Sequence, residues 1–298
     1  MAAVCGRVLH AADRTTSTAV QAAANLIPAG YAQHRNPTRL PVRPYTARMG
    51  EPSLGDIAAV LDQVGSSGAG RPRLTWYGPD EERVELSGHV LRLWAAKTAN
   101  LLVEEFDLHA GDTVRVDMPV HWRAVAIAMG ACWAGGEVPG DTTTADVWVW
   151  SPRGTDLPDP AVPTGEDVDV VVALPALASQ FPGTPAGTVD YVHEIGTYPD
   201  EFRPVGPVGG TDLMRRAARL SPELSDHPRL ALILEPDQDL SQALAAIVAA
   251  LAGDGSVVLI HSSRAAGAEE LCAQEQVTRR WARAAAAEPD TGGDAQVS

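Results

Sequence analysis

Two neighbouring residues stand where a binding pocket is expected. His121 and Trp122 come directly after a run that predicts a buried strand, 114–118, and open a run that predicts a helix. Ligands in open α/β sheets bind at the carboxyl ends of the strands, so these side chains could form one wall of a pocket. The alternative is purely structural: a histidine at the start of a helix and a tryptophan in the core.

A second polar group lies further along the chain. His193 is followed by Glu194, and Tyr198 is followed two positions later by Asp200. These four side chains could line a cleft. Ordinary surface positions explain them equally well, so both interpretations stay open.

Other chemistries have little support. His89, His109 and His121 lack the spacing of metal ligands. No serine or cysteine has a recognisable partner for nucleophilic catalysis. The loop 65–70, GSSGAG, matches neither the dinucleotide-binding nor the nucleophile-elbow motif, so we assign it no phosphate or nucleophile role. The sequence therefore names no catalytic residue and no metal site.

The stretch 85–138 contains the elements that must position His121 and Trp122. Ser87 is a good N-cap, and apolar residues then recur at helical spacing. A strand, 114–118, follows and ends at a proline; the run 122–133 is apolar almost all round, which predicts a buried helix. Another strand is expected to begin after the glycine pair at 135–136. This order predicts a parallel sheet covered by helices.

The C-terminal part repeats this order. A strand at 229–234 precedes a helix at 240–251, which Asp239 can cap, and a glycine turn leads to a strand at 256–260. We therefore predict an α/β protein of two related parallel-sheet units packed with helices. The remaining predicted elements are a helix from 57 to 64, a β-hairpin within 74–86, strands at 146–150 and 168–174, and helices at 189–202, 212–220 and 267–281.

The stretch from Arg73 to Pro139 resembles the N-terminal part of the AMP-binding, adenylate-forming family. That family includes acyl-CoA synthetases, luciferases and peptide-synthetase adenylation domains. The similarity rests on a helix ending in ANLL, a GDTV strand start, and a small-residue helix ending in WAGG before the next strand. It resumes weakly near the C-terminus. In the family these motifs are structural, so the resemblance implies a truncated relative with the family's N-terminal fold, the hairpin included.

The resemblance also implies where a nucleotide would bind. The family holds ATP phosphates with a Ser/Thr/Gly-rich loop that closes on a Pro-Lys pair, and this loop should fall just before the helix 212–220. The sequence there is GPVGGTD, with Gly206, Gly209, Gly210 and Thr211 as the corresponding residues. The loop has no lysine, and Asp212 would repel phosphate. We interpret it as a degenerate nucleotide loop; a divergent functional loop is the alternative.

Two further parts of the family pattern are missing. The chain lacks the downstream acidic-aromatic motif that positions adenine and Mg²⁺, and the small C-terminal domain that carries a catalytic lysine. Lys97 is the chain's one lysine, and it falls on a helix that is structural in the family. The resemblance thus implies ATP or AMP as a ligand only if the residues that bind it have diverged.

Composition excludes some partners. The formal net charge is −15, so a nucleic acid is not expected to bind. No apolar run reaches the roughly 18 residues of a membrane span, and we expect a cytoplasmic protein. The cysteines are few and include no CxxC pair, which argues against a zinc site or a disulfide framework. They are Cys5, Cys132 and Cys272.

The two ends of the chain differ from its middle. Residues 1–48 carry six arginines and one acidic residue, without a sustained helix or strand pattern. We expect a disordered basic extension. Its composition superficially resembles a transit peptide; the alternative is an over-extended gene start with Met49 as the true first residue. Residues 49–283 should form the α/β domain, and residues 284–298 a disordered tail.

Three functions remain open. The first is a catalytically degenerate relative of the adenylate-forming family that binds or regulates, through a protein partner or a small acyl or nucleotide ligand. The second is a divergent acyl-activating ligase, or one half of a split one. The third is an unrelated α/β protein, for example a hydrolase or a transferase, with a superficial resemblance.

Overall fold

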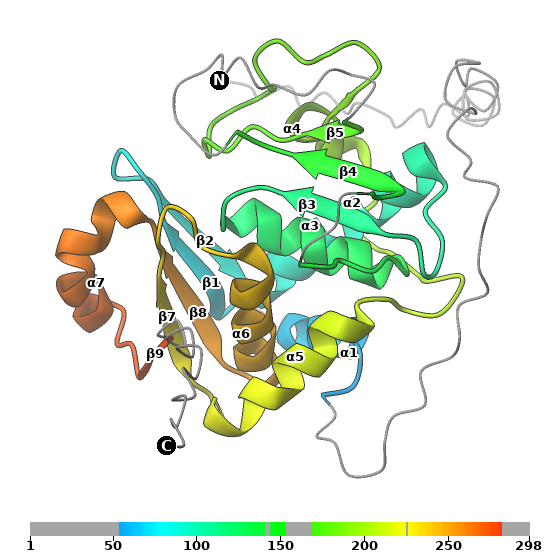
Figure 1. Cartoon of the computed structure of the whole chain (residues 1–298). Coiled ribbons are helices and arrows are strands. Elements are labelled where there is room, and N and C mark those ends of the chain that lie inside the picture. The colour runs from blue at the N-terminus through cyan, green and yellow to red at the C-terminus, as the bar shows by residue number, and fades with distance from the viewer. Residues whose placement is uncertain (1–53, 69, 141–143, 153–167, 225, 282–298) are drawn as a thin grey trace, which may run out of the picture. The chain divides into compact units, whose positions relative to one another are not determined.

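The computed structural model describes residues 54–281, apart from 69, 141–143, 153–167 and 225 (Figure 1). The predictions of a disordered extension over 1–48 and a disordered tail over 284–298 therefore concern residues outside the described ranges. All described residues belong to one compact unit, Ala47–Ser298.

Two sheets organise this unit. The first has five strands in the order β2-β1-β8-β7-β9. Strands β1 and β2 form an antiparallel hairpin, whereas β1, β8, β7 and β9 run parallel. Their bounds are β1 Pro72–Tyr77, β2 Arg83–Ser87, β7 Arg229–Ile233, β8 Ser256–Ile260 and β9 Arg279–Trp281. The predicted hairpin thus forms one edge of this sheet, and the other three strands come from the C-terminal part of the chain.

The second sheet has four strands in the order β3-β4-β5-β6, all parallel. Their bounds are β3 Val114–Asp117, β4 Val147–Trp150, β5 Val170–Val171 and β6 Val189–Asp190. Both sheets have a strand, a small-residue helix and an adjacent parallel strand: β3, α3, β4 in one and β7, α6, β8 in the other. The prediction of two related parallel-sheet units packed with helices is confirmed.

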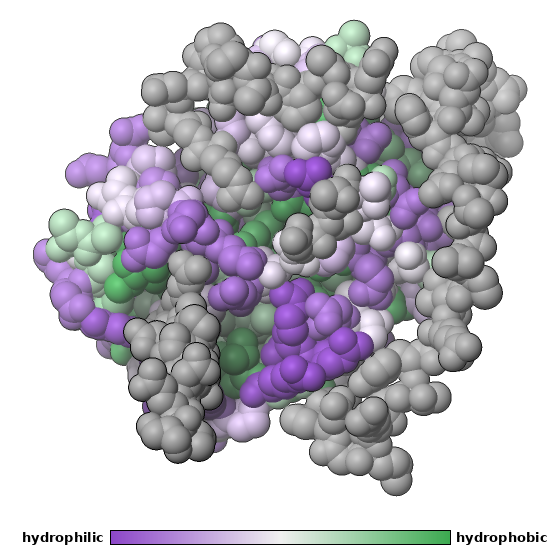
Figure 2. Space-filling model, in the orientation of Figure 1, coloured by the Kyte–Doolittle hydropathy of each residue, from purple (hydrophilic) through white to green (hydrophobic). Residues whose placement is uncertain are grey.

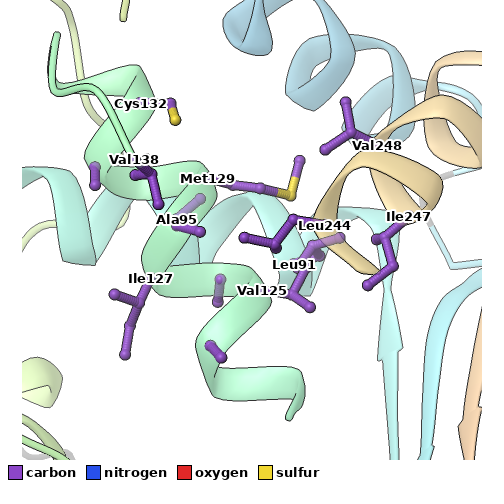
Figure 3. Close-up of a cluster of buried hydrophobic side chains, with 14 of the residues drawn as sticks. Leu91, Ala95, Val125, Ile127, Met129, Cys132, Val138, Leu244, Ile247 and Val248 are labelled. Carbon is purple, nitrogen blue, oxygen red and sulfur yellow. The ribbon is translucent and has the colours of Figure 1, made fainter. Parts of the chain in front are cut away.

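Helices lie between the sheets: α2 Gly88–Phe106, α3 Trp122–Trp133 and α6 Leu240–Ala252 (Figure 1). Two more helices pack beside them, α1 Ile57–Ser66 against α2 and α5 Thr211–Leu220 against α6. Side chains of α2, α3 and α6 meet in one apolar cluster, which Figure 3 shows around Leu91, Met129 and Leu244. Since residues of both sheets also belong to this cluster, the two sheets share a core.

The two central helices α2 and α3 approach closely because of a glycine. A Cβ atom added at Gly130 would lie 2.6 Å from the carbonyl oxygen of Ala95 and 2.6 Å from the Cβ of Thr98. Every residue of α3 is buried, as its apolar pattern predicts. The outer face of the five-stranded sheet is covered by α7, Ala268–Gln274.

Four local predictions are wrong or incomplete. The segment 267–281, expected to be one helix, contains the shorter helix α7 and then strand β9; a 3-10 helix, Ser262–Gly267, comes directly before α7. The expected strand 168–174 has only two ladder residues in β5, and the expected helix 189–202 begins with strand β6 before the one-turn helix α4, Tyr191–Glu194. The strand expected after the glycine pair is a single parallel bridge between Thr113 and Glu137.

In the described ranges, no helix has the length and apolarity to cross a membrane.

Candidate functional site

The predicted nucleotide loop packs against the end of α3. The Gly209 N–H donates to the carbonyl of Cys132 at 2.8 Å, and the Gly210 N–H donates to the carbonyl of Gly136 at 3.0 Å. A Cβ atom at Gly209 would lie 2.2 Å from that same Gly136 oxygen. At Gly210 the backbone is left-handed, with φ +74°, and a Cβ atom would lie 2.6 Å from the Cys132 Sγ. Both glycines therefore permit a close approach of two backbone segments.

A carboxylate occupies the start of α5. The Thr211 N–H donates to Glu137 Oε1 at 3.1 Å. A helix N-terminus attracts anions because its first amides are free and its dipole is positive there. In this chain the first amide of the helix, at Thr211, is bonded to the protein's own Glu137, and the amides at 209 and 210, just before the helix, have carbonyl acceptors.

The predicted loop residues do not form one cradle. A Cβ atom at Gly206 would meet only Ala110, at 3.9 Å, so Gly206 lies apart from the tight junction at Gly209 and Gly210. The charges of α5 also pair with each other, since Asp212 contacts Arg215 at 2.9 Å and Arg216 at 3.0 Å. Figure 2 shows the hydrophilic residues gathered over this helix.

His121 and Trp122 lie in the core at the carboxyl end of β3. The exposed fractions of their side chains are 2% and 4%. His121 Nδ1 accepts from the Arg123 N–H at 3.1 Å, which makes this histidine the N-cap of α3. Its ring packs edge-on against Trp76 of β1, with 4.7 Å between centroids. Burial, with the charges of Arg123 and His261, holds the pKa of His121 well below its usual range.

Sequence reasoning missed two charged residues at this edge: Arg123 ties the start of α3 to the segment after β5, and Glu82 connects the two sheets. The guanidinium of Arg123, 2% exposed, donates to the carbonyls of Ala173 and Pro175, both at 3.0 Å. Glu82, in the β1–β2 turn, accepts from Trp76 Nε1 at 2.7 Å and from the Ala176 N–H at 2.5 Å. The single arginine inside the apolar run 122–133 was the available signal for this connection.

A cavity of about 630 Å³ lies beside β6 and α4. His193, Glu194 and Tyr198 line it, together with Glu105, so three of the four residues proposed from sequence to line a cleft do so. Tyr198 donates to Glu105 Oε1 at 2.7 Å, and burial with that carboxylate raises the pKa of the phenol. Asp200 instead pairs with Lys97 at 2.7 Å. His121 and Trp122 do not contribute to this lining.

A second cavity, of about 280 Å³, lies between β3 and the start of α6. Its lining includes Arg115, Asp117, Gln238 and Ser241, none of which the sequence reasoning singled out.

Within the described ranges, no group of three His, Cys, Asp or Glu side chains could hold a metal ion. Cys132 and Cys272 are buried free thiols.

Comparison with known proteins supports the fold. No family model matches the chain. A curated family protein of Mycobacterium tuberculosis H37Rv, whose name states no activity, is 27% identical over 232 residues; the match covers 74% of this chain and 96% of that protein.

The similar solved structures are those of adenylate-forming enzymes. An acyl-CoA synthetase of Brucella canis matches with a TM-score of 0.53 at 18% identity, over 78% of this chain and 48% of its own. A coronafacic acid ligase of Pectobacterium brasiliense matches with a TM-score of 0.56 at 12% identity, over 76% and 49%. The chain thus spans about half the length of these enzymes. It has the α/β fold of the N-terminal region of adenylate-forming enzymes.

Proposed function

We propose that this chain is a binding protein that keeps the fold of an adenylate-forming enzyme without activating carboxylic acids. Its role is to hold a small ligand or a protein partner. The proposal goes beyond the shared fold, because similarity at this level of identity carries no activity with it.

The carrying observation is the occupied N-terminus of α5. Binding of ATP phosphates at a loop of this kind needs free backbone amides and an unopposed positive end of the helix. Here the amides of Gly209 and Gly210 donate to carbonyls, and the amide of Thr211 donates to Glu137. A phosphate bound at residues 209–211 would have to displace three internal hydrogen bonds and lie beside the Glu137 carboxylate.

The nearby cations do not offset the repulsion between a phosphate and the Glu137 carboxylate. Phosphoryl and adenylyl transfer depend on positive groups aimed at the charge that develops in the transition state. Arg215 and Arg216 pair with Asp212, and Lys97 is held at 2.7 Å from Asp200 on another part of the surface. These ion pairs support a protein that binds a ligand or partner rather than an enzyme that transfers an adenylyl group.

A half-enzyme is the second candidate. The chain matches 48% of the length of the Brucella canis synthetase, and in this second proposal a separate protein supplies the other half. In that case the loop at 206–212 would rearrange when the partner binds. The match covers 96% of the curated relative, so nearly all of that protein corresponds to this region.

The test is acid-dependent exchange of labelled pyrophosphate into ATP by the purified full chain, with a panel of short, medium and long carboxylic acids. We expect no exchange, and no thermal shift with ATP or AMP. A ligand that binds only the folded state at 100 times its Kd adds about 2.7 kcal/mol, which raises Tm by roughly 5–10 °C. Exchange above the rate of an enzyme-free control would refute the proposal.

A matched pair of variants tests the role of Glu137. Glu137→Ala removes both the charge and the acceptor at the start of α5, whereas Glu104→Ala removes an equal charge from the exposed face of α2. If the occupied helix end is what prevents nucleotide binding, only Glu137→Ala should gain a measurable ATP-induced shift. Equal behaviour of the two variants would contradict that explanation.

A further inference from the structure

The segment 196–201, here called the strap, lies against α2. Residues 198–201 belong to no helix or strand. Among the described residues, the backbone groups of 199–201 form no hydrogen bond with another backbone group. A segment without such bonds opens more readily than a helix or a sheet, so the side chains that hold the strap decide how firmly it is closed.

Lys97 of α2 binds the strap at three oxygen atoms. Its Nζ donates to the carbonyl of Tyr198 and, at 3.4 Å, to the carbonyl of Gly196. The third partner is Asp200 Oδ1, at 2.7 Å. An ammonium group has three donor hydrogens, so these three acceptors use all of them. Because the Lys97 side chain is also only 14% exposed, its amine is both shielded and fully bonded.

Asn100 binds the strap from the same face of α2, three positions further along the helix. Its Nδ2 donates to the carbonyls of Pro199 at 3.1 Å and Glu201 at 3.0 Å. The strap in turn supplies Tyr198, 8% exposed, whose hydroxyl donates to Glu105 Oε1 at 2.7 Å. Since Tyr198 lines the cavity of about 630 Å³, the closed strap also forms part of the wall of that cavity.

The amine of Lys97 has no equivalent on another side chain, because it belongs to the one lysine among 298 residues. Transfer of an acyl group to an amine requires a neutral nitrogen with a free electron pair. The closed strap holds Lys97 as an ammonium ion with every hydrogen bonded to an acceptor. The strap must therefore open before this nitrogen can react.

We propose that Lys97 is the latch of the strap, and that opening of the strap makes this lysine a site for acyl transfer from an activated acyl donor. Nζ loses a proton to solvent and attacks the acyl carbon; the N–C bond forms as the bond to the leaving group breaks, and a second proton is released. The product amide is uncharged and keeps one N–H, so it cannot rebuild the ion pair with Asp200, and the strap stays open. The inference does not depend on the proposed function.

Acetylation of the full chain by N-hydroxysulfosuccinimidyl acetate measures how well the closed strap protects Lys97. Mass spectrometry of a proteolytic digest follows the acetylated fraction of Lys97 over time. A short peptide with one free lysine, added to each tube, reports the reactivity of the reagent. We expect Lys97 to react at least about tenfold more slowly in the folded chain than in the chain unfolded by guanidinium chloride.

A matched pair of variants tests the latch. Asp200→Ala removes a carboxylate that binds the amine, whereas Glu201→Ala removes an equal charge from the next residue, which contributes only its backbone carbonyl. Acetylation of Lys97 should become about two- to fivefold faster in Asp200→Ala and stay unchanged in Glu201→Ala. Asp200 is 64% exposed, so its replacement leaves the fold intact.

A second pair tests whether loss of the lysine charge opens the strap. Lys97→Gln is uncharged, as an acylated lysine is, whereas Lys97→Arg keeps the charge and the donors. Tetranitromethane nitrates accessible phenols, and the closed strap buries Tyr198. We expect nitration of Tyr198 to be at least about fivefold faster in Lys97→Gln than in Lys97→Arg.

Three results would overturn the inference: acetylation of Lys97 as fast in the folded chain as in the unfolded chain, equal acetylation rates in Asp200→Ala and Glu201→Ala, or equal nitration of Tyr198 in Lys97→Gln and Lys97→Arg. Neither experiment contains a nucleotide, so these results leave the proposed function untouched.

Discussion

Replacing Gly209 by alanine should destabilise the protein strongly, although this residue lies in a loop. The added methyl group would lie 2.2 Å from the carbonyl oxygen of Gly136 and 2.4 Å from that of Gly135. Both obstacles are backbone atoms, which cannot rotate away as a flexible side chain would. The loop must therefore separate from the turn at the end of α3.

The magnitude follows from two costs. Overpacking by one methyl group costs about 1–3 kcal/mol, and rigid backbone neighbours favour the upper part of that range. Separation also weakens the 2.8 Å hydrogen bond from the Gly209 N–H to Cys132, which contributes about 1 kcal/mol. We expect a loss of roughly 3–4 kcal/mol, or a Tm lower by roughly 6–15 °C for a domain of this size.

Thermal and urea unfolding of Gly209→Ala and Gly206→Ala would measure the loss of Tm and of unfolding free energy. Gly206 lies in the same loop, but an added methyl group there would meet only Ala110 at 3.9 Å. Gly206→Ala should stay within about 0.5 kcal/mol of the wild type. If Gly209→Ala melts within about 1 °C of the wild type, the close-packing explanation of this glycine is wrong.

Three further predictions concern single side chains. The pKa of His121 is lower in the folded protein than in the unfolded chain, so below about pH 6.5 the unfolded chain binds a proton that the folded protein does not. The free energy of unfolding should therefore fall with pH, by up to about 1.4 kcal/mol per pH unit. In His121→Asn, which can still cap α3, urea unfolding measured between pH 5 and 7 should show a weaker dependence of this free energy on pH. Asp239→Ala should cost about 1 kcal/mol in urea unfolding because α6 loses its N-cap, and Asp239→Ser should restore most of it. Glu82→Leu should cost about 1–3 kcal/mol because Trp76 Nε1 and the Ala176 N–H lose their acceptor, whereas Glu81→Leu, in the same turn but exposed, should cost little by the same measurement.

Local signals predicted most of the elements. The helix expected at 122–133 has those bounds, and Ser87 and Asp239 cap α2 and α6 as their positions suggested. These features depend on residues within one or two helical turns, which a single sequence displays. The segment 267–281 was predicted wrongly because its last residues gain their strand conformation from pairing with β7, a contact that helical spacing does not report.

Less of the candidate site than of the fold could be predicted from the sequence. The position of the loop before α5 could be predicted, and so could its lack of lysine. Its partners could not, because Glu137 lies more than 70 positions from Thr211. The same holds for Arg123, whose acceptors are carbonyls about 50 positions away. Long-range contacts of this kind decide which polar groups are free to bind a ligand.

The parallel pairing of β1 with β8 also sets the order of events during synthesis. Leu74 of β1 lies opposite Val257 of β8, so nearly the whole described chain must be translated before these strands can meet. At about 5–20 residues per second the ribosome needs roughly 10–40 seconds for the intervening segment. During that time the hairpin has one unpaired edge, and Trp76, 2% exposed in the finished fold, lacks its cover. The β1 edge of the hairpin is therefore completed last, when β8 emerges and pairs with it.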